Sequence, residues 1–499
     1  MNLKAKLSSN AHIFIAFILF IQPIMNVISY WFTEWSMPSS ITLLMRLGVL
    51  FITVLYSFSI SEKKNIYFAM SAIMIAVYAL HAIVCFIENS EFAIVGDLSN
   101  YIRVIQMPVC VICFITLFKH NGKTYQGIQF GITAALILIY VVMIVSTLTG
   151  TDPHTYTDGK GMLGWFNNTN TQSANLSTLL PLSLGWQLTW KNKKKPACQI
   201  LFWATVVTGF LAMYYFCTRL AYLGIIAASV GLGVIILILN RKEWIKSAVL
   251  FALAILFVVL LPVSPMMDHK DNDDEWQGKV QGWADEKVEE LEVLDKMTKK
   301  EKIKNLSPLY AWKAADFVEI FGYERTMELF DYTTDIYDFT DIREKKIMFG
   351  ECLMEDSSNE FLSRLFGLEL ARFTVNTQQG EMIYDVENDF HGIYYLYGIT
   401  GLVAYLIFLG YFIYLVIWAL WKNAAKYFTM EAGSMGIGLV MCLIHAYLTA
   451  GVLRRPDASI FLSALLAIVY YLVKLKEYPD IPKKERKPKF RRLKAKRRV

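Results

Sequence analysis

Charge is scarce in this sequence. Aspartate, glutamate, lysine and arginine make up 18% of the 499 residues, whereas hydrophobic residues make up 55%. The mean hydropathy is +0.39. A soluble protein of this length needs more polar surface, so the composition excludes an ordinary soluble protein and predicts a polytopic membrane protein.

Cysteine is scarce outside the apolar runs, and internal repeats are lacking. Only Cys352, of the seven cysteines, lies in the long polar segment 265–389, so a disulfide framework is impossible there. Cys110 and Cys113 have C-x-x-C spacing, but they lie inside an apolar run without a second pair, which favours packing over zinc binding. We find no repeat of the kind that indicates an inverted-repeat transporter.

Long apolar runs are abundant. A helix needs roughly 20 such residues to cross a bilayer, and about twelve runs qualify. They lie at 11–31, 38–60, 66–88, 98–118, 127–149, 171–190, 198–217, 219–239, 244–264, 391–421, 433–453 and 458–474. The predicted fold class is all-α: a polytopic membrane protein of about 12 transmembrane helices with a large helical extracytoplasmic loop.

These runs divide the chain into four predicted regions. They are an N-terminal transmembrane region at 1–264, a large loop at 265–389, a C-terminal transmembrane region at 390–474 and a basic tail at 475–499. Apolar residues at near-helical spacing within the loop predict a helical cap, because a structureless loop of that length is improbable. The acidic cluster at 271–275 lacks the glycine and distal glutamate of a calcium loop, which favours a solvated helix start.

Basic residues indicate the orientation. Lysines and arginines, such as the KNKKK at 191–195 and the RKEWIK at 241–246, fall on every second connection, and cytoplasmic loops are enriched in them. We therefore expect a multi-pass protein of a plasma membrane, with both termini cytoplasmic and the loop outside. The first run contains Gln22 and Pro23 without a cleavage site, which favours a retained anchor. The tail is expected to bind anionic lipid and no nucleic acid, since Phe490 is its only aromatic residue.

Several arginines lie where a membrane protein should avoid charge. Arg46 and Arg103 fall inside apolar runs, where burial costs roughly 2.5–3.5 kcal/mol, so each needs an anionic partner, a wet cavity or a side chain that snorkels outward. Arg219 opens a run, and Arg454 and Arg455 occupy the outer turn VLRRPD between the last two runs. Guanidinium groups that converge at this depth would form an anion site suited to phosphate.

Amides and acids precede two of the runs. Asn168 and Asn170 lie in an amide-rich stretch at 161–184 and could cap a helix or line a sugar-binding surface. The stretch VENDFHGIYYLYGITG places Glu387, Asn388 and Asp389 before another run, where acids and amides cap helices and complement the helix dipole. His391, four residues after Glu387, would share its face and could orient it, replace it as proton acceptor or simply pack.

Three of these segments, in this order, resemble the O-antigen ligase and polymerase family of bacterial membrane glycosyltransferases. They are FNNTNTQSANLSTLLPL, TRLAYLG and the stretch from 386 to 401. Ligases of the family typically show H-[NSQ]-x9-G-x-x-G, and here Asn388, Gly398 and Gly401 match this pattern. Glu387 stands at the histidine position, which is similar to the acidic E-x-D of the polymerase branches.

The resemblance implies a metal-independent glycosyltransferase without cofactors that uses a polyisoprenyl-diphosphate-linked glycan on the outer face. Such a site needs a base and charge stabilisation of the leaving group. The candidate bases are Glu387 and His391. The candidate ligands of the donor diphosphate are Arg46, Arg103, Arg219, Arg343, Arg454 and Arg455, with Arg364 a weaker candidate. The candidate glycan-binding residues are Asn168, Asn170, Asn388 and Asp389.

The leading functional prediction is a polymerase that joins lipid-linked repeat units into a capsular, exopolysaccharide or O-antigen-like chain. Two alternatives remain: a ligase that transfers finished glycan to another acceptor, and a flippase that moves lipid-linked glycan without chemistry. The expected partners are the lipid-linked glycan, the bilayer, and flippase and chain-length regulator proteins.

Overall fold

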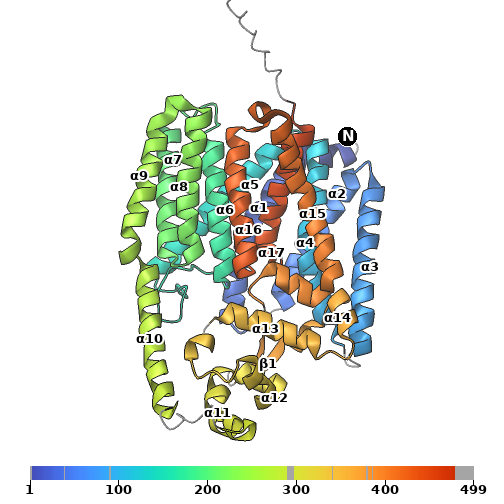
Figure 1. The fold of residues 1–499 in the computed structure, drawn as a ribbon. Helices are drawn as coiled ribbons and strands as arrows, with labels where there is room; N and C mark the ends of the chain where they lie inside the picture. The colour runs from blue at the N-terminus through green and yellow to red at the C-terminus, as the bar shows by residue number, and fades with distance from the viewer. Residues whose placement is uncertain are drawn as a thin grey trace, which may run out of the picture.

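The computed structural model describes residues 3–38, 40–88, 92–288, 297–339, 341–377, 380–384 and 386–477. In these ranges the chain forms a bundle of long helices with a layer of shorter helices at one end (Figure 1). The basic tail predicted at 475–499 lies outside the described residues from position 478 onward.

The bundle consists of long helices at the predicted apolar runs. The first part of the chain contributes α1 (Leu3–Glu34), α2 (Ser40–Ile60), α3 (Lys64–Glu88), α4 (Ile94–His120), α5 (Thr124–Leu148), α6 (Thr169–Gln187), α7 (Pro196–Tyr215), α8 (Arg219–Leu239) and α9 (Trp244–Leu260). The last part contributes α15 (Asp389–Tyr427), α16 (Met430–Thr449) and α17 (Pro456–Tyr470). In the described ranges, 11 helices are long and apolar enough to cross a membrane, which confirms an all-α polytopic membrane protein.

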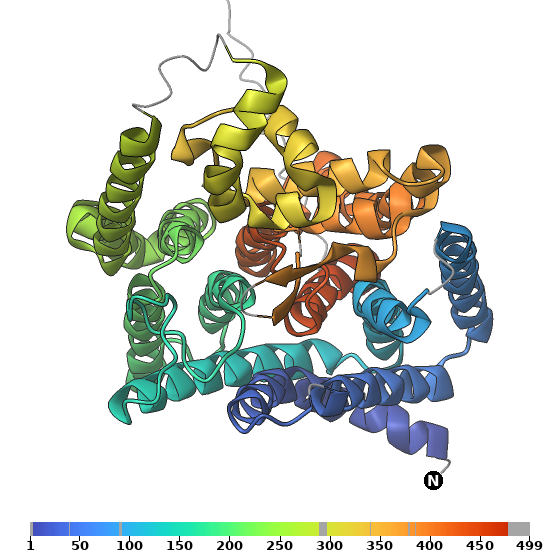
Figure 2. The same ribbon diagram turned by 90° about the horizontal axis from the view of Figure 1, so that it is seen from below.

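The helix α6 differs from the helices around it because its sequence is rich in amides and hydroxyls. Every residue from Thr171 to Gln187 is buried, and the helix packs against α5, α7, α8, α16 and α17. Seen along the bundle, α16 and α17 lie in the middle of the surrounding helices (Figure 2). Neighbouring helices therefore surround α6 in place of lipid, and its polar side chains can face protein.

The polar segment forms a helical layer that we call the cap. It contains α10 (Pro265–Val288), α11 (Lys299–Lys313), α12 (Ala315–Leu329), α13 (Ile342–Glu355), α14 (Glu360–Phe366) and the antiparallel hairpin of β1 (Thr374–Thr377) and β2 (Gly380–Ile383). The end of the bundle that it covers is termed the capped face, and α1 begins at the opposite end (Figure 1).

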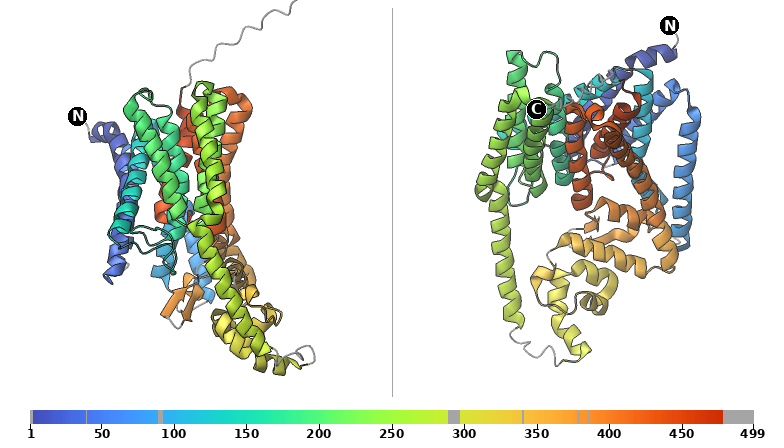
Figure 3. Two further views of the ribbon diagram at one scale, coloured as in Figure 1. Left: turned by 90° about the vertical axis from the view of Figure 1, so that its left-hand side faces the viewer. Right: turned by 45° about the horizontal axis from the view of Figure 1, so that its top comes forward.

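The helix α10 continues almost directly from α9, with the short turn Leu261–Val263 between them, so the two form one long rod (Figure 3). The acidic residues at 271–275 are exposed but do not start a helix, because α10 begins at Pro265. The prediction of a helix start there was wrong: proline at the first helical position already provides the start signal. Among the described residues no cluster of His, Cys, Asp or Glu is arranged to hold a metal ion.

Hydrogen bonds fasten the cap to α3 and α4, on the side of the bundle away from α10. The carboxylate of Glu88 accepts the backbone N–H groups of Ser358 and Asn359, each at 2.8 Å. The buried Asp97 accepts the N–H of Leu370 at 3.2 Å. The cap is thus held at both ends.

A break in α15 provides a third attachment of the cap. Gly398 has φ +66° within the helix, and a Cβ there would lie 2.3 Å from the carbonyl carbon of Leu365, at the end of α14. The N–H of Leu368 donates to the carbonyl of Tyr395 at 2.8 Å. Glycine is required because it alone combines this dihedral angle with this close approach.

Candidate active site

The start of α15 is fixed by two of the residues that precede the apolar run. Asn388 is the N-cap, and its side chain accepts the N–H groups of Phe390 at 2.9 Å and His391 at 3.1 Å. Asp389 is fully buried and accepts the N–H groups of Val452 at 3.0 Å and Leu453 at 2.7 Å. These contacts account for both side chains without a glycan, so we do not place Asn388 and Asp389 in the site.

Arg454 belongs to the same buried arrangement. Its Nε lies 3.3 Å from Asp389 Oδ1 and its Nη2 donates to the carbonyl of Val386 at 2.6 Å. The side chain is 6% exposed. A buried charge pair of this kind holds the turn between α16 and α17 against the start of α15, and a diphosphate ligand would have to break it.

Glu387 lies just before the helix and faces α13. Its carboxylate is 3.0 Å from Lys346 Nζ and 3.7 Å from Arg343 Nε, and the side chain is 30% exposed. Because Asn388 is the N-cap, Glu387 is neither the cap nor part of the helix. Its side chain is therefore held by cations at the edge of an open space.

That space is a cavity of about 490 Å³, here called the Glu387 cavity. It lies between the starts of α6 and α8, α10, α13 and the end of α16. Its lining residues are Tyr156, Asn170, Ser173, Thr218, Arg219, Leu220, Met266, His269, Lys270, Asp273, Asp274, Gln277, Asp341, Ile342, Arg343, Glu387 and Thr449. The cavity brings together the predicted Glu387, Arg219, Arg343 and Asn170 from distant parts of the chain.

Arg219 reaches this cavity because it is the first residue of α8. Thr218 caps the helix by accepting the N–H of Ala221 at 3.2 Å, and its hydroxyl lies 3.0 Å from that of Ser173. The preceding Cys217 has φ +71°, so the chain turns sharply before the helix. The turn leaves the guanidinium at the positive end of α8, which favours an anion nearby.

The rim of the Glu387 cavity contains an interaction that the sequence did not predict. His269 Nδ1 is 2.9 Å from Asp158 Oδ2, and the ring of His269 stacks on that of Tyr156 with centroids 3.7 Å apart. The hydrogen bond from His269 holds the pKa of Asp158 below its usual value. Burial raises the pKa of the Tyr156 hydroxyl, and the charges of Arg219 and Arg343 oppose that rise.

His391 does not accompany Glu387. Its ring lies 6.2 Å from the ring of Tyr395, and its Nδ1 has no hydrogen-bond partner among the described residues. The prediction of a shared helical face fails because Glu387 precedes the N-cap, so the four-residue spacing does not apply. His391 does not line the Glu387 cavity.

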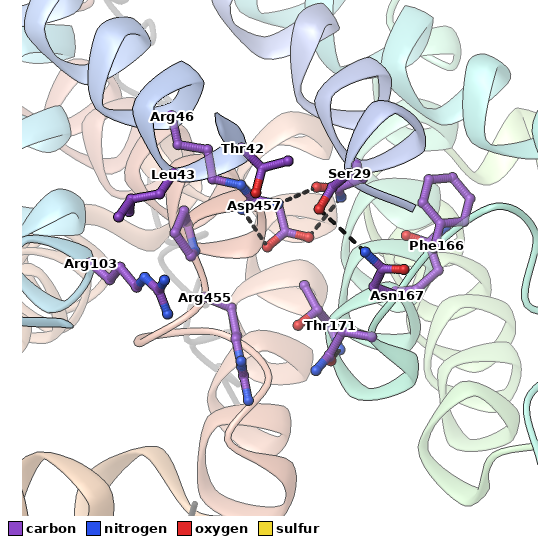
Figure 4. A pocket seen from close by; sticks show the side chains of 14 residues that line it. Ser29, Thr42, Leu43, Arg46, Arg103, Phe166, Asn167, Thr171, Arg455 and Asp457 are labelled. Atoms are coloured by element: carbon purple, nitrogen blue, oxygen red, sulfur yellow. Dashed lines mark hydrogen bonds and ion pairs between the residues drawn. The ribbon is translucent and has the colours of Figure 1, made fainter. Parts of the chain in front are cut away.

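Other predicted arginines gather in a second cavity of about 250 Å³, the Arg103 cavity (Figure 4). It is formed by α1, α2, α4, the start of α6 and the start of α17. Its lining residues are Asn26, Ser29, Thr42, Leu43, Arg46, Arg103, Phe166, Asn167, Asn168, Thr171, Gln172, Arg455, Pro456 and Asp457. The six candidate arginines thus do not form a single clamp, because they are divided between two cavities and one buried pair.

Arg364, the weaker candidate, lies away from both cavities. Its guanidinium contacts Glu360 at 2.7 Å, Glu351 at 3.0 Å and the hydroxyl of Tyr394 at 3.1 Å. These contacts tie α14 to α13 and α15 and indicate a structural role.

The two cavities share a wall. Asn168, Thr171 and Gln172 line the Arg103 cavity, whereas Asn170 and Ser173, on the same turns of α6, line the Glu387 cavity. The turn between α16 and α17 packs on this wall so closely that a Cβ at Gly451 would lie 2.9 Å from the carbonyl oxygen of Asn170.

Comparison with known families gives one match over most of the chain. A family model described as "O-antigen ligase like membrane protein" matches residues 8–478. A search of curated proteins found no match.

Proposed function

Since the chain belongs to the family of O-antigen ligase like membrane proteins, we propose that it is a polymerase of lipid-linked glycan repeat units at the outer face of a bacterial plasma membrane. The family and the fold establish a multi-pass membrane enzyme of the glycosyltransferase type that acts on glycans. The choice of polymerisation, of the lipid-diphosphate donor and of the residues below is our proposal.

The observation that carries the proposal is the convergence of Glu387, Arg219 and Arg343 on one cavity at the capped face. Transfer of a sugar from a lipid diphosphate needs a proton acceptor for the attacking hydroxyl and cations for the leaving diphosphate. The Glu387 cavity holds both kinds of group, contributed by the start of α8, by α13 and by the residue before the N-cap of α15.

In the proposed reaction, a hydroxyl of the acceptor sugar attacks the anomeric carbon of the donor. The new C–O bond forms as the bond to the diphosphate breaks, Glu387 takes the hydroxyl proton, and the lipid diphosphate leaves with the bonding electrons. Arg219 and Arg343 stabilise the negative charge on its oxygens. A diphosphate that binds Arg343 would compete with the 3.7 Å contact to Glu387 and leave the carboxylate with the 3.0 Å contact to Lys346.

An apolar groove supports a lipid-linked substrate. It has a volume of about 380 Å³ and lies between α3, α4 and α15, with Met74, Tyr101, Ile393 and Tyr397 in its lining. Most of its lining is hydrocarbon or aromatic, so it suits a polyisoprenyl chain better than a sugar.

Glu387 favours polymerisation over ligation. It occupies the position at which ligases of the family typically have histidine, and the following Asn388 and glycines match the pattern. A carboxylate at this position can accept the proton of the attacking hydroxyl in place of the imidazole.

The test is the glycan profile of cells that carry only the Glu387→Gln variant. The amide keeps the size of the side chain but cannot accept the proton, so we expect single lipid-linked units to accumulate on the outer face and long chains to disappear. Glycans would be resolved on gels, with membrane abundance of the protein checked alongside.

The matched control is Glu324→Gln, which changes an exposed carboxylate on α12 and should leave the ladder normal. A normal ladder with Glu387→Gln would remove Glu387 from the chemistry. Accumulation of full-length lipid-linked polymer would instead indicate a ligase, and units retained on the inner face would indicate a flippase.

A further inference from the structure

From the composition of the Arg103 cavity we infer a second anion site, which binds the diphosphate of the acceptor substrate. The identity of the ligand rests on the proposed function, because a polymerase of lipid-linked units must hold two lipid diphosphates at once. The anion site itself depends only on the residues that line the cavity.

The charges around the Arg103 cavity favour an anion. Three arginines line it, against the single carboxylate of Asp457. That carboxylate is already compensated, because Arg46 Nη1 lies 3.6 Å away and Asn26 Nδ2 donates to it at 2.8 Å. Arg103 and Arg455 also line the cavity (Figure 4), so arginines outnumber the carboxylate three to one among its lining residues.

Two buried polar groups in the same lining have no hydrogen-bond partner among the residues that the structure describes. Thr171 and Gln172 are each 1% exposed, and Thr171 Oγ1 and Gln172 Nε2 make no hydrogen bond to any described residue. A buried donor without a partner destabilises the folded state, because it has given up its hydrogen bond to water. Phosphate oxygens in the cavity would accept from both groups as well as from the guanidinium groups.

Three helices begin at this cavity. Thr42 and Leu43 lie in the first turn of α2, Thr171 in the first turn of α6, and Pro456 is the first residue of α17. The N-terminus of a helix carries a partial positive charge of roughly half an elementary charge. Three such ends add to the arginines and favour an anionic ligand over a cationic or neutral one.

Size and position identify the part of the ligand that fits. A cavity of about 250 Å³ lies below the usual range for a drug-sized ligand, roughly 300–1,000 Å³, so it suits an ionic head group better than an oligosaccharide. The wall of α6 that it shares with the Glu387 cavity places this head group beside the proposed catalytic site. An acceptor anchored here would leave its glycan to extend toward Glu387.

The test counts binding sites. Full-length protein in nanodiscs would be titrated with radiolabelled polyprenyl diphosphate that carries no glycan. We expect two bound equivalents for the wild type and one for the double variant Arg103→Gln, Arg455→Gln, with affinity at this site lowered roughly tenfold to a hundredfold by either single change. The control Arg325→Gln, on the exposed surface of the cap, should keep two equivalents.

A parallel titration with inorganic diphosphate shows whether the cavity binds the head group of a lipid or a free phosphate anion. If the double variant loses inorganic diphosphate but keeps two equivalents of the lipid, the cavity binds free phosphate and the assignment to the acceptor is overturned. If neither titration responds to the double variant, the anion site itself is overturned.

The variant Gln172→Met tests the same site even if the arginine variants do not fold. It removes the unpartnered amide without adding a charge, so the midpoint of thermal unfolding should stay the same or rise while affinity at this site falls. If Gln172→Met and Arg103→Lys both bind as the wild type does, the site is overturned even when the double variant fails to fold.

The Glu387→Gln variant separates this inference from the proposed function. It should retain both equivalents, since its substitution removes no cation. A normal glycan ladder in that variant would contradict the catalytic proposal alone, whereas insensitivity of binding to the arginine changes would contradict the second site alone.

Discussion

At the scale of single residues, Arg219 shows how local geometry creates a binding group. The left-handed turn at Cys217 and the cap by Thr218 fix the start of α8, so the guanidinium at its first position faces the Glu387 cavity. A guanidinium offers a planar fork of donors that matches phosphate oxygens, whereas an ammonium offers only a point charge.

Replacement of Arg219 by alanine or by lysine should therefore distinguish the effect of its positive charge from the effect of its planar arrangement of donors. Arg219→Ala is expected to lower the rate of polymer synthesis roughly tenfold to a hundredfold, by loss of charge-assisted hydrogen bonds to the diphosphate, and Arg219→Lys should fall between it and the wild type. The measurement is the initial rate with purified enzyme and a lipid-linked unit.

Arg325→Lys serves as the control, because Arg325 pairs with Glu355 on the exposed surface of the cap. Wild-type rates in Arg219→Ala would show that the diphosphate does not contact this residue.

Sequence patterns identified part of the site. They singled out Glu387, Arg219 and Arg343, which share a cavity, and Asn168, which caps α6 by accepting the N–H of Thr171. They could not place His391, since that required the first residue of α15 to within one position, and helix boundaries are the least certain part of such a prediction.

His269 was missed for a different reason. It is an isolated histidine in the sequence, and its partner Asp158 lies 111 positions away. Only the folding of the loop before α6 against α10 brings the two together, and neither spacing nor periodicity encodes that contact. Thr171 was likewise indistinguishable from an ordinary residue of a helix start, whereas Gln172 belongs to the amide-rich stretch at 161–184 that the sequence did indicate.

At the scale of the helices, the break in α15 explains the first glycine of the G-x-x-G pattern. The apolar run predicted one continuous span at 391–421, whereas the structure turns at Gly398 and receives the end of α14 there. Thr400 Oγ1 also donates to the carbonyl of Leu365 at 2.9 Å. Hydropathy detects the run but not the break, because the break depends on a contact with the cap.

The variant Gly398→Ala should loosen the cap. A positive φ costs a residue with a Cβ about 1–2 kcal/mol, and the methyl group would also collide with the backbone of Leu365. We expect a lower midpoint of thermal unfolding and increased proteolysis of the cap, measured on the purified protein.

Gly410→Ala is a close control in the same helix, since nothing lies within 4 Å of a Cβ at that position. Alanine is favoured over glycine in a helix, so this variant should be as stable as the wild type or slightly more so. Equal stability of both variants would refute the packing argument for Gly398.

At the scale of the whole molecule, the distribution of basic residues predicts how the chain is oriented in the membrane. The predicted alternation of basic loops places both termini on one face and the polar segment on the other, and α1 begins at the end of the bundle opposite the cap (Figure 1). The side that faces the cytoplasm remains a prediction from the basic residues.

Labelling in intact cells would test this orientation. Lys300→Cys in the cap and Lys194→Cys in the loop between α6 and α7 are matched substitutions at exposed positions. A membrane-impermeant maleimide should label the first in intact cells, and the second only after permeabilisation.

The labelling background should carry Cys198→Ser, since Cys198 is the one cysteine among the described residues that is not buried. The reverse pattern of labelling would place the cap in the cytoplasm and exclude an extracytoplasmic enzyme.

The polarity of α6 has a consequence for how the protein is made. Its amides and hydroxyls give this helix little tendency to enter lipid by itself, because a polar group in hydrocarbon needs a partner. One of its packing partners, α16, begins at Met430, far downstream. The wall between the two cavities can therefore be completed only after most of the chain has been synthesised. During biogenesis α6 depends on its neighbours, or on an insertase, to stay in the membrane until α16 arrives.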